Sequence, residues 1–435
     1  MRTPSAKNLK ITAINPLEIL DSRGNPTLEV EVRTRDSGGV ASVPSGISTG
    51  IHEAFELRDG DPRRYNGHGV QTAVNNIRSI IAPEIVGQIV TRQRDIDKMM
   101  INLDATVNKS KLGANAILGV SLAVAKAAAE ALGLPLYRYL GGEEARVLPV
   151  PLMNVINGGL HAGNGLKIQE FLILPLGAIT FAEALRMGVE VYHALKTVLR
   201  EQYGPSAINL GDEGGYVPPL QKTCDALNAI MTAISRAGYS PGDDVCLGLD
   251  AAANGFYNST TKTYTLDTKT YTTNDLITVY TNLIEEYPIV SIEDPFYEED
   301  VQGFKTLTRE IGSYVQVVGD DLFVTNLERL KWGIETHAAN AILLKVNQIG
   351  TLTEALDAAR HAQHNQYGVI VSNRSGETTD TYIADIAVAL NTGQIKTGAT
   401  ARGERIAKYN RLLQIEAQLG HKAIYEGKKS SFLKR

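Results

Sequence analysis

The apolar and polar positions of the first 145 residues predict a short strand followed by helices. Residues 27–32, TLEVEV, alternate between apolar and polar side chains, which is typical of a half-buried strand, and the preceding DSRGNP has the composition of a turn. Residues 73–86 and 113–133 have a helical pattern, and the second stretch is alanine-rich and ends at a Gly-Leu-Pro sequence. We expect residues 1–145 to form a small α+β domain.

From residue 146 onward, short apolar runs alternate with segments of helical pattern. The runs are FLILP (171–175), VCLGLD (245–250), IVSIEDP (289–295), VQVVGDD (315–321), AILLKVN (341–347), VIVSNRS (369–375) and QIKTG (394–398). Buried strands that alternate with helices are typical of parallel βα units, and so many units favour a closed barrel over an open sheet. We therefore expect an α/β fold, in which residues 146–435 form a TIM-like β/α barrel beside the smaller domain.

Charged side chains stand at the ends of most of these runs. They are Asp250, Glu293, Asp320, Lys345, Arg374 and Lys396. In β/α barrels the carboxyl ends of the strands and the loops after them build the active site. The spacing therefore predicts that these six side chains meet at one end of the barrel.

The three acids in this set indicate a metal site. Singly, Asp250, Glu293 and Asp320 each have the ordinary alternative of a helix N-cap or a surface acid. Together on neighbouring strands they would repel one another, and a hard divalent cation removes that repulsion. Ligation by oxygen alone favours Mg²⁺ over Zn²⁺.

The three basic residues suggest chemistry on an acidic substrate. A buried lysine beside other cations is shifted toward its neutral form, which makes Lys345 a candidate base. Arg374 and Ser375 are suited to hold a phosphate or a carboxylate, although a solvated arginine in a loop has a similar sequence. A metal, a lysine base and an anion clamp together indicate removal of a proton beside a carboxylate.

Composition and charge exclude several classes of protein. The chain has 435 residues, of which 43% are hydrophobic, and a net charge of −5, which argues against a nucleic-acid surface. Its cysteines, Cys224 and Cys246, are too few for a disulfide scaffold. The N-terminal sequence lacks the apolar region of a secretion signal, and the longest apolar stretch, 116–125, is too short to span a bilayer. We expect a cytoplasmic protein without a membrane span.

The order of the motifs resembles the enolase family along nearly the whole chain. The matching segments are DSRGNPT (21–27), PSGISTGIHEA (44–54), GANAILGVSLA (113–123), NVINGGLHAG (154–163), IQEF (168–171), GDEGG (211–215), SIEDP (291–295), LLKVNQIGT (343–351), SGET (375–378) and QIKTG (394–398). The resemblance implies the enolase-type barrel and the reversible dehydration of 2-phosphoglycerate to phosphoenolpyruvate in glycolysis and gluconeogenesis. It also implies a homo-oligomer, either a dimer or an octamer.

The resemblance implies a role for each matching residue. Asp250, Glu293 and Asp320 would bind one Mg²⁺, and Ser48 would ligate a second Mg²⁺ that arrives with the substrate. Lys345 would take the C2 proton, Lys396 would neutralise the carboxylate charge that builds up, and Glu213 would protonate the departing C3 hydroxyl. Gln169 and Glu170 would line the side of Glu213, His161 would lie in a loop of the site, and Arg374 with Ser375 would hold the phosphate.

These roles require opposite protonation states. Lys345 must be neutral before the reaction, and we expect neighbouring cations to lower its pKa. Glu213 must carry a proton when the hydroxyl leaves, so we expect its surroundings to raise its pKa.

The chain departs from the family pattern at three places. Asn373 stands where the family has histidine, and we expect activity to survive with an altered pH profile or substrate affinity. Asn254 and Gly255 replace the usual Ser-Glu, for which we expect a local structural effect. Ile47 replaces the usual alanine and adds bulk beside Ser48.

Two other functions remain open on the sequence. One is a related barrel enzyme that acts on a different acid, and the other is an enolase-like paralogue with weakened activity that serves as a binding protein. Glu213, the Arg374–Ser375 pair and the segment around Ser48 favour an enolase over the first. The presence of Lys345, Lys396, Glu213 and all three acids favours it over the second, because a protein without activity should lose such costly buried charges first.

Overall fold

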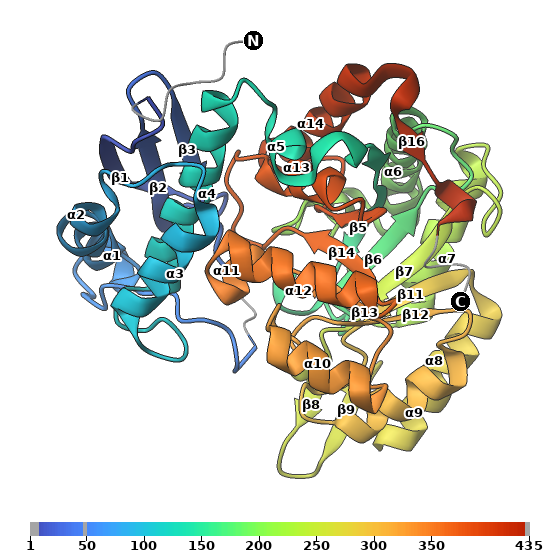
Figure 1. Ribbon diagram of the computed structural model, residues 1–435. Helices are drawn as coiled ribbons and strands as arrows, with labels where there is room; N and C mark the ends of the chain where they lie inside the picture. The colour runs from blue at the N-terminus through green and yellow to red at the C-terminus, as the bar shows by residue number, and fades with distance from the viewer. Residues whose placement is uncertain (1–7, 47–49, 431–435) are drawn as a thin grey trace.

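The computed structural model describes residues 8–46 and 50–430, and its first part contains a three-stranded antiparallel sheet (Figure 1). The strands β1 (Ala13–Leu20), β2 (Pro26–Arg33) and β3 (Gly38–Ser42) lie in the order β1-β2-β3. In β2, Leu28, Val30 and Val32 are fully buried, whereas the glutamates between them are not. This alternation confirms the strand predicted over residues 27–32.

The helices of the first part are α1 (Gln71–Asn76), α2 (Ala82–Ile85), α3 (Gln93–Asp104), α4 (Ala114–Ala131) and α5 (Leu136–Gly141). Of these helices, α4 packs on this sheet, and α3 and α5 contact α4. The helix expected over residues 73–86 contains a π-helical segment, η2 (Ile77–Ile81), between α1 and α2. The predicted alanine-rich helix is α4, and its small side chains allow the sheet to approach closely.

Helix α4 is also the candidate for a membrane span in the described part of the chain. Its 18 residues exceed the apolar stretch 116–125, and its length and composition suffice to cross a bilayer, but 83% of it is buried inside the protein. The core helix of a folded domain passes the same test, so α4 is weak evidence for a span.

The second part contains a closed barrel of eight strands in the order β11-β12-β13-β14-β15-β5-β6-β7. Their bounds are β5 (Val150–Asn157), β6 (Glu170–Leu174), β7 (Cys246–Asp250), β11 (Ile289–Glu293), β12 (Gln316–Gly319), β13 (Ala341–Leu344), β14 (Gly368–Ser372) and β15 (Gln394–Lys396). All seven predicted runs form strands of this barrel, which confirms the expected α/β fold. The strand β5 was not predicted.

The direction of one strand corrects the prediction that all units are parallel. Strand β6 is antiparallel to both β5 and β7, whereas the other neighbouring pairs are parallel. As a result, β6 brings its first residue, Glu170, to the end of the barrel where the other strands have their last residues. Glu170 lies opposite Asp250 in the register of β6 and β7.

Helices surround the barrel (Figure 1). They are α6 (Phe181–Tyr203), α7 (Thr223–Arg236), α8 (Thr273–Glu286), α9 (Val301–Ile311), α10 (Leu327–Thr336), α11 (Val346–Ile349), α12 (Leu352–His364), α13 (Tyr382–Ala389) and α14 (Gly403–Leu419). A small sheet of β8 (Tyr257–Asn258), β9 (Thr263–Leu266) and β10 (Lys269–Tyr271) follows β7, and β4 (Val147–Leu148) pairs with β16 (Ile424–Tyr425). Short 3₁₀ turns include η4 (Gly159–His161) and η6 (Ala253–Phe256).

The first part lies against the barrel and is fastened to it by hydrogen bonds (Figure 1). The Ser45 N–H donates to the Gly376 carbonyl at 2.8 Å, and the Lys126 amine pairs with Asp380 at 2.6 Å. These contacts hold Ser45 and α4 near the loop that follows β14, close to the carboxyl ends of the strands. The division of the chain at residue 145 stays a prediction.

Candidate functional site

The predicted strand-end residues meet at one end of the barrel. Asp250, Glu293 and Lys396 are the last residues of their strands, and Asp320 and Lys345 come directly after theirs. The register places Glu293 beside Asp250 on neighbouring strands. The side chains that the sequence predicted to converge are therefore together, and all three carboxylates are buried.

Lys396 is the centre of the acidic cluster. Its amine donates to Asp250 Oδ2 at 2.8 Å and to Glu293 Oε2 at 2.7 Å, and lies 3.3 Å from Glu170 Oε1. Burial alone would lower the pKa of Lys396, but these three carboxylates raise it well above the ordinary value. Lys396 is therefore a fixed positive charge in the site.

Lys345 does not have the protonation state that the sequence predicted. Burial favours its neutral form, but its amine forms an ion pair with Asp320, and this charge raises the pKa of Lys345. The expectation of a lowered pKa is wrong for this arrangement, because it counted the neighbouring cations and not the carboxylate that contacts the amine. Gln348 donates to the other oxygen of Asp320 at 2.8 Å and orients that carboxylate.

Arg374 is held by a carboxylate that the sequence did not assign to the site. Its guanidinium contacts Glu53 through two nitrogens, Nη1 to Oε2 at 3.0 Å and Nη2 to Oε1 at 3.2 Å, and Nη1 also donates to Asn347 at 3.0 Å. The predicted partner Ser375 is buried beside it, and its hydroxyl accepts from Arg23 at 3.4 Å. Two cations, Arg374 and Arg23, thus lie at this edge.

A fully buried arginine supports the backbone of this edge. Arg405 in α14 donates to the carbonyl oxygens of Arg374 and Ser375, each at 2.6 Å, and to that of Asp212 at 3.2 Å. It therefore links the loop after β14 to the segment that carries Glu213.

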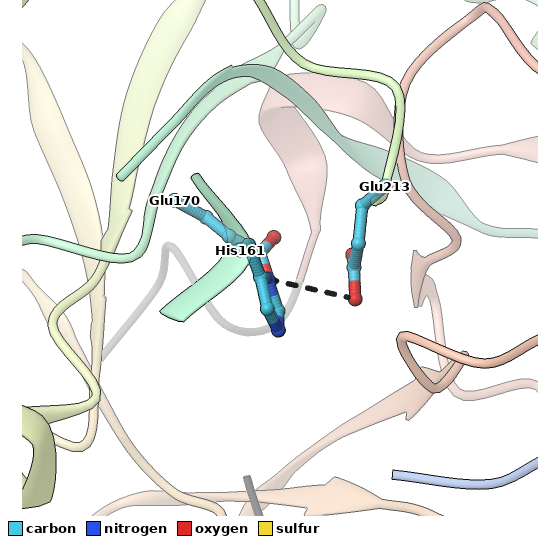
Figure 2. A group of neighbouring side chains, drawn as sticks. All are labelled: His161, Glu170 and Glu213. Carbon is cyan, nitrogen blue, oxygen red and sulfur yellow. Dashed lines mark ion pairs between the residues drawn. The ribbon is translucent and has the colours of Figure 1, made fainter. Parts of the chain in front are cut away.

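His161, Glu170 and Glu213 form a second group, which meets Lys396 through Glu170. His161 Nδ1 lies 4.0 Å from Glu170 Oε1 and 4.0 Å from Glu213 Oε1. Figure 2 shows Glu213 facing the imidazole of His161, with Glu170 close behind that ring. One ligand atom from each of the three residues lies within 4.8 Å of the others, and all three side chains are buried.

The two glutamates of this group have opposite pKa shifts. Burial raises the pKa of Glu170 well above its ordinary value, and the charge of Glu213 raises it further. Burial also opposes ionisation of Glu213, but Arg405, His161 and Lys396 outweigh it and lower the pKa of Glu213 to about 2. The expectation of a raised pKa for Glu213 is wrong here, since the basic residues that lower it come from distant parts of the chain.

His161 is held neutral in this group. Burial lowers its pKa, although the charges of Glu213 and Asp250 oppose that effect. Neither ring nitrogen has a hydrogen-bond partner among residues 8–46 and 50–430. A buried polar ring without a partner is the arrangement expected where a polar ligand enters.

The remaining predicted residues have different outcomes. Gln169 lies next to Glu170, and its amide donates to Asp250 Oδ2 at 3.3 Å, so it belongs to the site. Ser48 and Ile47 lie outside the described residues. The groups described here enclose a cavity of about 10 Å³, which is lined by His161, Gln169, Glu170, Glu213, Asp250, Lys345, Ser372, Asn373, Arg374, Ser375 and Lys396.

The acidic donor set fits a divalent cation. Burial and the neighbouring charges of Asp250 and Asp320 raise the pKa of Glu293 well above its ordinary value, even though Lys396 contacts it. Glu293 is thus poorly stabilised as an anion by the adjacent lysine, and a hard cation ligated by these carboxylate oxygens would stabilise its charge. Asp294 accepts the backbone N–H groups of Asp320 at 2.9 Å and Asp321 at 2.8 Å, and so positions the third acid.

The structure gives a local explanation for one departure from the family pattern. Asn254 in η6 donates to Glu298 Oε1 at 3.0 Å and to Asp321 Oδ2 at 2.9 Å, and its oxygen accepts the Glu298 N–H at 3.0 Å. Asn254 therefore joins three segments at the edge of the site.

Sequence reasoning did not identify Glu53, Arg405 or Asp294 as parts of the site. Glu53 belongs to the motif PSGISTGIHEA and Asp294 to SIEDP, so their places in these motifs were a signal. Arg405 belongs to no motif quoted above, and only the packing of α14 against the loop after β14 reveals its role.

Comparisons with known proteins agree with the geometry. A sequence model described as "Enolase, N-terminal domain" matches residues 11–140, and one described as "Enolase, C-terminal TIM barrel domain" matches residues 145–433. The chain is 60% identical to the enolase of Thermococcus gammatolerans over 420 residues, which are 97% of each chain. It is 60% identical to the enolase of Methanopyrus kandleri over 425 residues, or 98% of this chain and 99% of that one. It is 59% identical to the enolase of Pyrococcus furiosus over 420 residues, which are 97% of each chain.

Proposed function

The chain belongs to the enolase family, and we propose that its barrel site carries out the reversible dehydration of 2-phospho-D-glycerate to phosphoenolpyruvate. The activity is that of a lyase, phosphopyruvate hydratase, in glycolysis and gluconeogenesis. The observation that supports this most directly is the meeting of Lys345, Lys396 and Arg374 with buried acids at one end of the barrel. Neither a different acid substrate nor a binding role is favoured by the relatives.

The cations of the site suit a substrate with two acidic groups. Arg374 and Ser375 would hold the phosphate, because guanidinium and hydroxyl donors match its oxygens. Arg405 fixes the carbonyl groups of both residues and so directs their side chains. Lys396 would offset the negative charge that develops on the substrate carboxylate when the C2 proton leaves.

Lys345 is the proposed base for the C2 proton. It must be neutral to accept that proton, and its ion pair with Asp320 opposes this. When held by Asp250, Glu293 and Asp320, Mg²⁺ would supply positive charge that neutralises these acids and stabilises the dianion. A second Mg²⁺, with Ser48 as one ligand, is proposed to bind together with the substrate.

Glu213 is the proposed acid for the C3 hydroxyl, and Glu170 is its partner. In this structure the raised pKa belongs to Glu170 and the lowered one to Glu213, so the proton of the pair is held on Glu170. Donation by Glu213 requires that this proton be available to it, and one oxygen of each carboxyl group lies within 4.8 Å of the other. His161 and Gln169 would line the same side of the substrate.

Further proposals follow from the family. We propose a homo-oligomer, either a dimer or an octamer, a cytoplasmic location, and a division into a capping domain of residues 1–145 and a catalytic barrel of residues 146–435. Ser45 and Glu53 of the first part contact Gly376 and Arg374 at the end of the barrel that carries the site, which supports a capping role.

The test is growth of phosphoenolpyruvate absorbance after 2-phosphoglycerate and Mg²⁺ are added. We expect growth with Mg²⁺ that EDTA abolishes, and that Lys345→Ala abolishes while Lys331→Ala, at a partly exposed lysine of α10, does not. A flat trace from folded, Mg²⁺-loaded protein would contradict the proposal and favour the weakened paralogue.

A further inference from the structure

Each of three cations in the site is paired with a carboxylate. Lys396 contacts Asp250 and Glu293, and Lys345 contacts Asp320. These three acids are the proposed Mg²⁺ ligands. Arg374 forms its ion pair with Glu53, which lies three residues after Gly50. Glu53 belongs to no proposed metal site.

The contact between Glu53 and Arg374 is two-pronged and buried. Each carboxylate oxygen accepts from one terminal nitrogen, Oε2 from Nη1 at 3.0 Å and Oε1 from Nη2 at 3.2 Å, and the side chains of Glu53 and Arg374 are 9% and 3% exposed. This fork-to-fork geometry is the one by which arginine binds carboxylates and phosphates alike. Glu53 therefore occupies the face of Arg374 that an oxyanion of a substrate would use.

The same carboxylate also fastens the segment from Gly50 to Glu53. Glu53 Oε1 accepts the Gly50 N–H at 3.2 Å and the Gln348 amide at 3.4 Å. Gly46 also packs against the guanidinium, so closely that a Cβ atom there would lie 2.0 Å from Arg374 Nη2. Movement at the Glu53–Arg374 contact would thus be transmitted to Gly46 and Gly50.

The size of the cavity shows that contacts must open for a substrate to enter. Its volume of about 10 Å³ is close to the smallest space that holds one water molecule. A three-carbon acid with a phosphate is far larger, so the cationic side chains must exchange some of their present partners. Bound Mg²⁺ would compete with Lys345 and Lys396 for the carboxylates of Asp250, Glu293 and Asp320. At Arg374, the substrate phosphate would compete with Glu53 for the guanidinium.

We propose that Glu53 is a positioning residue that competes with the substrate phosphate for Arg374. Phosphate binding then replaces at least one oxygen of Glu53 on the guanidinium and loosens the Gly50–Glu53 segment. The inference rests on the proposed function, since it uses the phosphate role of Arg374. It predicts that the negative charge of Glu53 lowers the affinity of the site for phosphate.

A purely structural role for the pair predicts the opposite result. If Glu53 only holds Arg374 in place, removing its charge leaves a mobile guanidinium and weakens anion binding. If Glu53 competes, removing its charge frees Arg374. When a competitor occupies a site about nine-tenths of the time, its removal tightens the apparent affinity about tenfold.

The direct test is calorimetric titration of inorganic phosphate into the Mg²⁺-loaded protein. We expect Glu53→Gln to bind phosphate about three- to tenfold more tightly than the wild type. The matched control is Glu56→Gln, which removes a carboxylate of the same segment that pairs with Arg58. In an Arg374→Gln background, Glu53→Gln should give no gain.

Each other outcome of this titration overturns the proposal. Weaker or unchanged binding in Glu53→Gln means that the pair is a scaffold. Equal gains in Glu53→Gln and Glu56→Gln mean that general charge, and not contact with the guanidinium, sets the affinity. A gain that persists without Arg374 places the anion elsewhere.

The steady-state kinetics of 2-phosphoglycerate conversion give a second test of the role of Glu53. They also distinguish a failure of this proposal from a failure of the proposed activity. For 2-phosphoglycerate we expect Glu53→Gln to lower KM several-fold with little change in kcat, since the phosphate takes no part in the bond changes. A raised KM would contradict the competition. If the wild type does not convert 2-phosphoglycerate at all, the proposed function fails, and the phosphate titration still decides the role of Glu53.

Discussion

The amide of Asn373 lies among the charged groups of the site. Its nitrogen donates to the Arg374 carbonyl at 3.0 Å, and its backbone N–H donates to the Lys396 carbonyl at 2.9 Å. Burial opposes ionisation of Glu213, but Arg405, His161 and Lys396 lower its pKa, and the Asn373 side chain adds to their effect. A neutral amide fills this place, so the residue adds no titration of its own near neutral pH.

A histidine at this position should make activity depend on pH in a new way. For Asn373→His, we expect the ratio of variant to wild-type kcat/KM to change at least about threefold between about pH 6 and about pH 8, where histidine titrates. The measurement is kcat/KM against pH for both proteins, with Asn373→Gln as the control that keeps the amide. A ratio that is constant across this range would rule the idea out.

At the residue scale, the positions of the site residues could be predicted from the sequence, but their protonation states could not. The six strand-end side chains were predictable because apolar runs locate the strands and barrel geometry gathers their ends. The protonation of Lys345 and Glu213 was not, because it depends on the contact of Lys345 with Asp320 and on the charge of Arg405 near Glu213. Such contacts join residues far apart in the chain, and hydrophobic patterns do not encode them.

At the scale of elements, the packing of β3 on α4 leaves no space for a side chain at Gly39. A Cβ atom there would lie 2.3 Å from the Ala127 nitrogen and 2.4 Å from the Ala123 oxygen. We expect Gly39→Ala to lower the free energy of unfolding by about 1–3 kcal/mol or more, because backbone atoms of the helix must move.

The control for this substitution is Gly403→Ala, at the first residue of α14. A Cβ atom there has no described neighbour within 4 Å, so we expect no loss of stability. Both variants are compared with the wild type by thermal and denaturant unfolding. Equal midpoints for Gly39→Ala and the wild type would contradict the close packing of sheet and helix.

The junction of α3 with α12 should carry a pH-dependent part of the stability. The fully buried Asp97 accepts the Thr353 N–H at 3.1 Å, and burial raises its pKa despite this and other hydrogen bonds. A carboxyl whose folded-state pKa is raised binds protons more tightly in the folded chain. Stability from this group is therefore present below the unfolded pKa and is lost as pH rises through the folded pKa.

The test of this junction uses Asp97→Asn, which does not titrate. We expect the stability of the wild type relative to this variant to fall as pH rises from about 4 to about 7, by about 1.4 kcal/mol for each tenfold difference in proton affinity. Denaturant unfolding across this range measures it, with Asp95→Asn on the exposed face of α3 as the control. Parallel pH curves for the wild type and Asp97→Asn would show that the effect is absent.

The sequence predicted which segments form strands and helices, but it did not predict the direction of every strand. The alternation in β2 and the alanine-rich α4 follow from their residues. The run at 171–175 was correctly predicted to be a strand. A fully apolar sequence is compatible with either strand direction, so the antiparallel direction of β6 could not be predicted. In β5, Pro151 and the absence of a charged residue at its end hid the strand.

At the scale of the whole molecule, metal binding should stabilise the fold. The three acids lie on separate strands, so an ion held by all of them ties β7, β11 and β12 together. At Mg²⁺ concentrations about 100 times the dissociation constant, the expected gain is about 2.7 kcal/mol. Thermal unfolding with Mg²⁺ and with EDTA measures it.

The stabilisation by Mg²⁺ should depend on the three acids proposed as its ligands. We expect Asp320→Asn to lose most of the Mg²⁺-dependent rise in the unfolding midpoint, and Asp36→Asn, at an exposed aspartate, to retain it. An equal rise in the Asp320 variant would place the metal elsewhere.

The central claim is that Lys345 removes the C2 proton and that the pair of Glu213 and Glu170 acts separately on the C3 hydroxyl. The most direct measurement is exchange of the C2 hydrogen of 2-phosphoglycerate with deuterated water, followed by NMR in the presence of Mg²⁺. We predict that Lys345→Ala abolishes exchange and dehydration together, whereas Glu213→Gln retains exchange and loses dehydration by a factor of about 10²–10⁴. Exchange that persists in Lys345→Ala would contradict the account.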